Sequence, residues 1–455
     1  MGIHDFLVQV ESFMKAVSDF VWGPPLLVLL VGTHLFLTFR LRFIQRYLGK
    51  AIRLSLQRRA EGDGDVSQFG ALTTALAATI GTGNIVGVAT AIAAGGPGAV
   101  LWMWLTGVFG IATKYGEAVL SVKYRVKTPQ GQMAGGPMYV LERGLNCKWL
   151  GVVFAAFTTV AAFGIGNMVQ ANAVANHLSK LNVPPWLSGA VMAVVTALVI
   201  LGGVKSIARA CEVLVPFMAI AYVAGCFYIL VMNAHAIPET IALIVKSAFT
   251  GHAALGGFVG AGVREAMRFG VARGLFSNES GLGSAPIVAA AAQTPNPVRQ
   301  ALVSSTGTFW DTVVVCAMTG LVLVGSGAWT GDFKDAAQMT HAAFDNIPLG
   351  PTILMVGLVT FVFSTILGWS YYGEKAAEYL FGAKVIKPYR MLWVVLVMVG
   401  SVVTLDMVWA FADIANALMA LPNLISLILL NGVIVAETRK YLWEADKQSV
   451  VAENL

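Results

Sequence analysis

The chain has 455 residues, of which 57% are hydrophobic and only 12% charged, and its net charge is +6. Soluble domains carry about 25% charged residues, so this composition excludes a soluble protein and predicts an all-α protein that crosses a membrane many times. The four cysteines show no C-x-x-C spacing and the six histidines no ligand spacing, which argues against a disulfide framework or a zinc site.

Apolar runs of about 17–25 residues are long enough to cross a bilayer as helices. The longest run is also the most interrupted, as expected of a broken helix at 259–291. Eleven spans are predicted, near 20–39, 69–93, 98–122, 150–176, 187–203, 211–232, 259–291, 299–325, 350–372, 390–405 and 408–436.

Lys and Arg residues gather on one side of these spans. About 22 of the 30 fall in the loops after odd-numbered spans or in the C-terminal tail, helix ends included, and only four fall on the opposite side. Because cytoplasmic loops carry the excess of basic residues, we expect the N-terminus outside and the C-terminus in the cytoplasm. The basic loop at 40–59 fits a topology anchor.

Two polar stretches interrupt predicted spans. TIGTGNIVG occupies residues 79–87, and GLFSNESGLGSAP occupies residues 274–286. Without the first span, two groups of five remain, each beginning with an interrupted helix. Since five is odd, the groups enter the membrane from opposite sides, which predicts an inverted repeat with its binding site at the two breaks. Ordinary kinks or close helix packing are the alternative.

This interpretation divides the chain into five parts. They are an N-terminal helix with its basic loop (1–68), the first repeat (69–232), an extracellular linker (233–258), the second repeat (259–436) and a cytoplasmic tail (437–455).

The breaks carry few charges, which suits a small zwitterion. Half-helix N-termini offer N–H groups to a carboxylate, and half-helix C-termini offer carbonyls to a cation. We expect the amides of Thr82, Gly83 and Asn84 to hold a carboxylate. The expected partners of the ammonium are carbonyls around Phe276, Ser277 and Asn278, with Glu279 either capping a half-helix or joining the site.

Two aromatic side chains, Phe276 and Trp369, are expected to limit the pocket to a short side chain. In the fourth span, Gln170 either contacts substrate or bonds to a neighbouring helix. Among buried charges, Glu117 lies one turn after Lys114, which favours a structural pair, and Asp311 is interpreted as a hydrogen-bond anchor.

Adjacent hydroxyls in the ninth span, Ser364 and Thr365, fit a cation site. Together with carbonyls from residues 77–80 they supply the oxygen ligands that sodium prefers. Hydroxyls in membrane helices usually bond back to the preceding turn, so this simpler role stays open. Proton coupling would instead require an essential membrane-embedded carboxylate.

Four segments taken together resemble the alanine or glycine:cation symporter family, within the amino acid–polyamine–cation superfamily that has the LeuT fold. They read GTGNIVGVATAIAAGGPGAVLWMW, GGPMYVLERGL, ARGLFSNESGLGSAP and FSTILGWSYYGE, in this order from about residue 69 to 380. Where NEA is expected, this chain has NES, which places the extra hydroxyl of Ser280 beside the site.

The resemblance implies sodium-coupled uptake of alanine and glycine, with D-alanine as a further candidate, across the bacterial cytoplasmic membrane. It implies a LeuT-like 5+5 inverted repeat preceded by one extra helix. Carried over by position, it points to Thr82, Gly83, Asn84, Gln170, Phe276, Ser277, Asn278 and Trp369 for substrate, and to carbonyls of Ala77 and Ile80 with Ser364 and Thr365 for sodium.

Other classes are expected to be excluded. An enzyme would show a catalytic dyad or metal motif, and a channel would show a repeated filter segment; neither pattern is evident. Sodium is the expected coupling ion, with no cofactor, no nucleic acid and no obligate protein partner besides the surrounding lipid.

Overall fold

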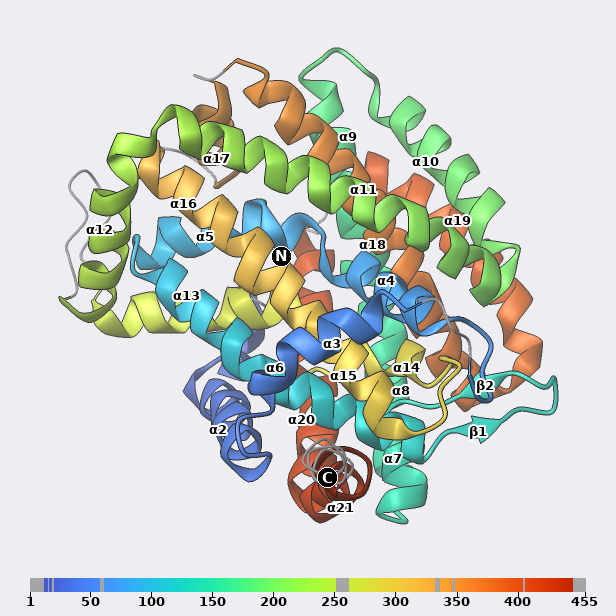
Figure 1. The fold of residues 1–455 in the computed structure, drawn as a ribbon. Coiled ribbons are helices and arrows are strands. Elements are labelled where there is room, and N and C mark those ends of the chain that lie inside the picture. Colours follow the sequence, from blue (N-terminus) through green and yellow to red (C-terminus); the bar gives the residue numbers. More distant parts are fainter. Residues whose placement is uncertain are drawn as a thin grey trace.

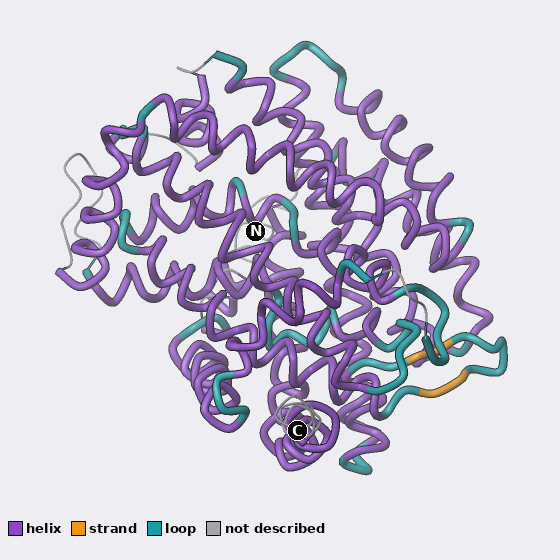
Figure 2. Tube along the Cα trace, in the orientation of Figure 1, coloured by secondary structure: helices purple, strands orange, loops and turns teal. Residues whose placement is uncertain are grey.

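The computed structural model describes residues 12–57, 61–250, 262–331, 336–345, 348–403 and 406–444, apart from positions 15 and 19. Parts of the expected N-terminal region (1–11), linker (251–258) and tail (445–455) lie outside the described residues. The described chain is almost entirely helical (Figures 1 and 2), and the one small sheet pairs β1, Val126–Lys127, with β2, Met133–Ala134.

The helices follow one another with short connections. In the first part of the chain they are α2 (Pro24–Arg40), α3 (Leu48–Ser55), α4 (Gln68–Thr79), α5 (Val86–Gly95), α6 (Ala99–Lys123), α7 (Pro137–Gly144), α8 (Lys148–Phe163), α9 (Val169–Ser179), α10 (Pro185–Ile200), α11 (Gly203–Met232) and α12 (Ile237–Thr250). In the second part they are α13 (Val263–Asn278), α14 (Pro286–Ala289), α15 (Pro297–Thr308), α16 (Ala317–Gly325), α17 (Ala336–Asp345), α18 (Gly350–Phe381), α19 (Ile386–Val402), α20 (Asp406–Leu429) and α21 (Asn431–Thr438).

Six helices in the described part are long and apolar enough to cross a membrane. They are Lys148–Ser179, Gly203–Met232, Pro297–Gly325, Gly350–Phe381, Ala383–Val402 and Ala412–Leu429. A seventh candidate joins α2 to Ile44–Ser55 through a bend of 66°. The predicted total of eleven also counts α6, α10 and the interrupted helices α4–α5 and α13–α14, none of which meets the same criterion of length and composition.

The two polar stretches do break their helices, over shorter segments than predicted. The first helix stops at Thr79 and resumes at Val86, and the second stops at Asn278 and resumes at Pro286. Phe276, Ser277 and Asn278 therefore belong to the last turn of α13 rather than to the break itself. The expected linker contains a helix, α12, which packs against α6, α13 and α16.

Packing brings the two broken helices into the centre of the molecule. Helix α13 packs along α5 and α6, and α4 packs against α11 and α18. The chain just before α4 also pairs with the chain just after α14, through a parallel bridge between Val66 and Ala292. Both breaks are therefore enclosed by protein, which is where non-helical backbone can exist at membrane depth.

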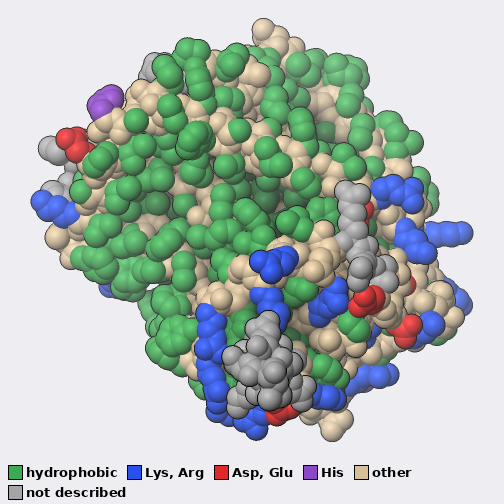
Figure 3. Space-filling model, viewed as in Figure 1, with side chains coloured by type: hydrophobic (Ala, Val, Ile, Leu, Met, Phe, Trp, Pro, Cys, Tyr) green, Lys and Arg blue, Asp and Glu red, His purple; other side chains and the backbone are tan. Residues whose placement is uncertain are grey.

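Charge on the surface is unevenly distributed. Figure 3 shows Lys and Arg side chains gathered in the lower and right part of the view, near the C-terminal end, while hydrophobic side chains cover the upper part. A broad apolar surface of this kind is stable against lipid.

Candidate functional site

The first break is held open by one side chain. Asn84 Oδ1 accepts a hydrogen bond from the amide of Gly81 at 2.8 Å. In an uninterrupted helix that amide would bond to the carbonyl of Ala77, so the carbonyl is released. The amide of Asn84 donates to the carbonyl of Gly81 at 3.2 Å, and so the prediction that this amide is available for a carboxylate is wrong. Among the described residues, the amides of Thr82 and Gly83 find no acceptor.

A buried carboxylate links the first break to α13. Asp311 lies in the π-helical segment Phe309–Cys316 between α15 and α16. Its Oδ1 accepts from Asn84 Nδ2 at 2.7 Å, and its Oδ2 accepts from the hydroxyl of Ser277 at 3.0 Å. Thr312 donates to the same oxygen at 2.6 Å. The prediction that Asp311 is a hydrogen-bond anchor is confirmed, and its partners come from both broken helices.

The second break frees the last carbonyls of α13 by diverting the amides that would otherwise bond to them. The amide of Ser280 donates to Asn278 Oδ1 at 2.9 Å, and that of Gly281 to Glu117 Oε1 at 3.0 Å. The amide of Leu282 donates to the carbonyl of Glu279, which adopts the left-handed conformation with φ 56°. In a continuing helix these three amides would bond to the carbonyls of residues 276–278, which are left without those donors.

Glu117 on α6 does not pair with Lys114 as predicted. Its Oε1 accepts from the amides of Gly281 and Gly283 and from Asn423 Nδ2 on α20, at 2.7–3.1 Å. Lys114 Nζ is buried and makes no hydrogen bond within the described chain. The carboxylate of Glu117 instead satisfies backbone amides that the break leaves without helical acceptors.

A small cavity lies between the breaks. Its volume is about 20 Å³, enough for one or two water molecules, so an amino acid enters only if the lining moves apart. The lining residues are Ala78, Thr79, Gly81, Thr82, Gly83, Ile165, Gln170, Phe276, Glu279, Thr365, Trp369 and Asn416.

Two unpaired acceptors belong to this lining. Gln170 Nε2 donates to Thr82 Oγ1 at 3.3 Å and to the carbonyl of Ile165 at 3.0 Å, and within the described part of the chain Gln170 Oε1 has no partner. Asn416 Oδ1 on α20 likewise has no donor among the described residues. The cavity thus has free amides on the side of the first break and free acceptors on α9 and α20, which is the polarity that a zwitterion requires.

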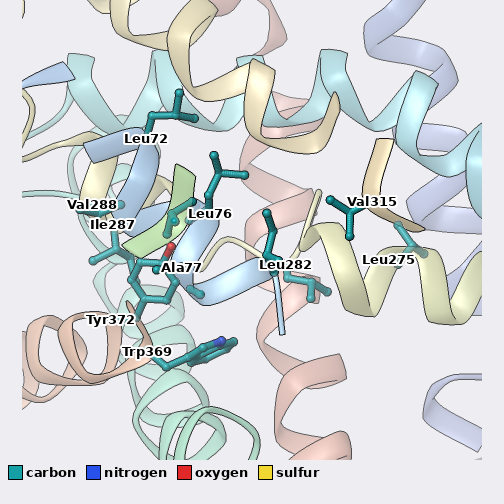
Figure 4. Packing of buried hydrophobic residues seen from close by; sticks show 14 of the residues in the cluster. Leu72, Leu76, Ala77, Leu275, Leu282, Ile287, Val288, Val315, Trp369 and Tyr372 are labelled. Atoms are coloured by element: carbon teal, nitrogen blue, oxygen red, sulfur yellow. The ribbon is translucent and has the colours of Figure 1, made fainter. Parts of the chain in front are cut away.

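Trp369 forms an aromatic wall of the cavity. It is 2% exposed, and Figure 4 shows it with Tyr372 on α18, close to Ala77 of α4. Its position depends on Gly166 in the π-helical turn Gly164–Met168, because a Cβ at Gly166 would lie 2.3 Å from the Cβ of Trp369. Substituting Gly166 therefore forces the wall to move.

Four oxygens meet where α18 passes the end of α4. Ser364 Oγ lies 3.2 Å from the carbonyl oxygen of Ala77 and 3.4 Å from that of Ile80, and Thr365 Oγ1 lies 3.4 Å from the latter. Both hydroxyls also lie within 2.9 Å of the carbonyl of Phe361, the back-bonding geometry that was the simpler expectation.

A hydroxyl has a single proton, and in both side chains the shorter contact, to Phe361, takes it. Lone pairs then face the carbonyls of Ala77 and Ile80 across 3.2–3.4 Å. Oxygen atoms placed about 2.4 Å from a common cation, as around Ca²⁺, have separations of this size. The arrangement fits an alkali cation with oxygen ligands.

A sequence model of the sodium:alanine symporter family matches residues 7–454. The chain belongs to this family. It is 53% identical over 442 residues to the sodium/alanine symporter AgcS of Methanococcus maripaludis, with 94% of this chain and 97% of that protein aligned. It is 54% identical over 440 residues to an uncharacterized transporter of Haemophilus influenzae, covering 95% and 96% of the two chains.

The fold is similar to that of MhsT, whose crystal structure was solved in complex with L-phenylalanine. The TM-score is 0.57 at 15% identity, over 81% of this chain and 89% of the other. This likeness concerns the fold alone. The sodium:alanine symporter family consists of transporters, so the chain is a multi-pass membrane transporter and not an enzyme.

Within this symporter fold, the residues predicted for substrate separate into two groups. Thr82, Gly83, Gln170, Phe276, Glu279 and Trp369 line the cavity. By contrast, the side chains of Asn84, Ser277 and Asn278 turn away from it, toward Asp311 or the amide of Ser280. Sequence reasoning missed Asn416, whose signal is an amide side chain inside the apolar run 408–436.

Proposed function

We propose that this protein is a sodium-coupled symporter that carries small neutral amino acids into the cell. Alanine and glycine are the proposed substrates, with D-alanine also accepted. The observation that carries the proposal is the pairing of free amides at Thr82 and Gly83 with free acceptors at Gln170 and Asn416 around one small cavity. An α-amino acid carries both a carboxylate and an ammonium, the two groups that such donors and acceptors would bind.

Size discrimination follows from the walls. Trp369 and Phe276 close the cavity from α18 and α13, and the ring of Phe276 lies 3.4 Å from the position of a Cβ at Gly83. A methyl group or hydrogen on the substrate needs the least displacement of these rings. Larger side chains require both to move.

Sodium is proposed to bind to Ala77, Ile80, Ser364 and Thr365, beside the amino acid. The cation would neutralise the facing oxygens and fix the end of α4 against α18. Substrate then meets amides already oriented by the first break, so each ligand favours binding of the other. The inward sodium gradient drives accumulation through alternating access.

The proposed architecture completes this mechanism. Eleven spans, with α2 ahead of a 5+5 inverted repeat, place the N-terminus outside and the C-terminus in the cytoplasm of a bacterial inner membrane. In that arrangement α4–α5 and α13–α14 are the first helices of the two repeats, related by inversion, and their half-helices line the transport path.

Proton coupling is the second candidate, favoured by one observation. Glu279 is a buried carboxylate that lines the cavity and accepts a hydrogen bond from the hydroxyl of Ser284. A proton on Glu279 would replace sodium as the coupled ion. No unpaired acid lies in the first break itself.

Uptake of radiolabelled alanine into proteoliposomes tests the proposal. We expect accumulation against a concentration gradient when sodium is higher outside, and none when potassium replaces sodium. Uptake that persists without sodium and follows an imposed pH gradient would overturn sodium coupling in favour of Glu279. Absence of alanine and glycine uptake under either gradient would overturn the substrate assignment.

A further inference from the structure

Lys114, in the second half of α6, is a buried cation that does not line the cavity between the breaks. Its side chain is 4% exposed, and its Nζ makes no hydrogen bond within the described chain. It lines a separate cavity of about 10 Å³, which has room for one water molecule. Asn278 lines this cavity too, and its Nδ2 has no acceptor among the described residues, so one water molecule can accept from both donors. Because lysine is almost never fully buried unless it is paired, the surroundings of this ammonium must compensate its charge.

The cavity around Lys114 lies between the ends of two helices. Thr79, the last residue of α4, and Asn278, the last residue of α13, both line it, together with Ser304 and Gly307 of α15. Helix α6 packs along α13 and α15, and α15 packs against α4, so these four helices surround the ammonium. The C-terminal end of a helix carries a partial negative charge that favours a nearby cation. Two half-helices direct this end toward the same place.

Three carboxylates add to the negative field around this cavity. Glu117, Glu279 and Asp311 each interact electrostatically with Lys114, and none of them is hydrogen-bonded to it. His34 of α2 is a further titratable group in its surroundings. One ammonium thus faces three carboxylates and two negative helix ends. This field favours a cation between the breaks and disfavours a bound anion.

We propose that Lys114 is a built-in cation, whose ammonium occupies a position between the two breaks that would otherwise require a second transported cation. The position adjoins the transport site, because Thr79 lines both this cavity and the one between the breaks. An ammonium tethered to α6 supplies positive charge there without entering or leaving the protein. The inference rests on the proposed sodium coupling and sets its stoichiometry, which is one sodium ion for each amino acid.

The ratio of sodium to alanine taken up tests the wild-type protein directly. Radiolabelled sodium and alanine are measured in the same proteoliposomes during initial uptake, and we expect one sodium ion per alanine. Sodium-dependent uptake with two ions per alanine would overturn the role of Lys114 and leave sodium coupling intact. Uptake that needs no sodium would overturn the proposed function and this inference with it.

Removing the charge tests the position of the built-in cation. Lys114→Met retains an unbranched side chain without the ammonium, so we expect a second sodium ion to enter, with the hydroxyls of Thr79 and Ser304 as available ligands. In equilibrium binding of alanine to the purified full-length protein, the Hill coefficient for sodium should rise from about 1 toward 2, the number of sites. Lys123→Met is the matched control on the same helix, since Lys123 pairs with Glu437 at 2.6 Å and is 44% exposed. This control should keep the wild-type coefficient.

Three results would contradict the built-in cation. A coefficient near 1 in Lys114→Met, with wild-type affinity for both ligands, would show that no cation is needed at this position. Loss of alanine binding at every sodium concentration, in a variant that melts like the wild type, would show that sodium does not replace the ammonium. Wild-type uptake that requires chloride and fails in gluconate would show that the cavity binds an anion. Lys114→Gln is the second neutral variant, measured in the same way if Lys114→Met does not fold.

Discussion

Both helix breaks leave buried backbone groups without helical partners, and the two breaks satisfy these groups by opposite means. The first, between α4 and α5, contains no charge and is braced from within, by the side chain of Asn84. The second, between α13 and α14, is braced from outside, by the carboxylate of Glu117 on α6 and by Asn423 on α20. The first releases amides toward the cavity, and the second releases carbonyls from the end of α13.

This difference teaches how one fold presents both polarities to a zwitterion. The side chain of Asn84 accepts a hydrogen bond from the amide of Gly81 and donates one to Asp311. The first break therefore needs no fixed charge, and a cation can bind beside it. A carboxylate such as Glu117 accepts hydrogen bonds from several backbone amides at once. With those amides bonded, the second break exposes only carbonyls. Asp311, bonded to Asn84 and Ser277, joins the two arrangements.

The largest expected effect comes from removing the external brace. Glu117→Ala leaves two amides and Asn423 without their acceptor, and each unsatisfied buried donor costs about 1–3 kcal/mol. We expect a loss on the order of 4 kcal/mol in the free energy of unfolding, measured by denaturation of the protein in detergent. The control is Glu142→Ala, whose side chain lies 3.8 Å from Lys148 and is 32% exposed. Equal stability of the two variants would show that the second break does not depend on Glu117.

A smaller effect on stability, but a strong one on transport, is expected from separating the breaks. Asp311→Ala removes the acceptor shared by Asn84 and Ser277, and we expect alanine uptake to fall roughly a hundredfold, about 2.7 kcal/mol. Asp311→Asn retains one acceptor oxygen, so its alanine uptake should lie between that of Asp311→Ala and that of the wild type. Normal uptake by Asp311→Ala would mean that the two breaks act independently.

The mildest change concerns the acceptor end of the cavity. Asn416→Ala removes one unpaired oxygen that we assign to the ammonium, and we expect the KM for alanine to rise roughly tenfold, as for loss of one hydrogen bond to a charged group. Asn172→Ala is the matched control, since Asn172 bonds to backbone carbonyls of Gly400 and Val403 instead. If both variants raise KM equally, the ammonium does not bind at Asn416.

The sequence predicted the broken helices well because glycine, serine and asparagine inside apolar runs leave few other structures. It could not predict which side chains brace them. Lys114 and Glu117 share a helix face, and this local spacing favours a pair. In the structure Glu117 instead accepts hydrogen bonds from the amides of Gly281 and Gly283, which lie 164 and 166 residues away in the sequence. Asn84, Ser277 and Asn278 similarly serve the backbone and Asp311 rather than the cavity, and Asn416 enters the lining only through tertiary packing.

The most direct test of the central claim is the mutual dependence of sodium and alanine binding. Equilibrium binding of alanine to the purified protein is measured over a range of sodium concentrations, and sodium binding over a range of alanine concentrations, in the wild type and in Ser364→Ala/Thr365→Ala. The account predicts that each ligand strengthens the other by the same factor, about 5–150-fold, and that the double variant abolishes this coupling while still binding alanine. Alanine affinity that is independent of sodium in the wild type would contradict it.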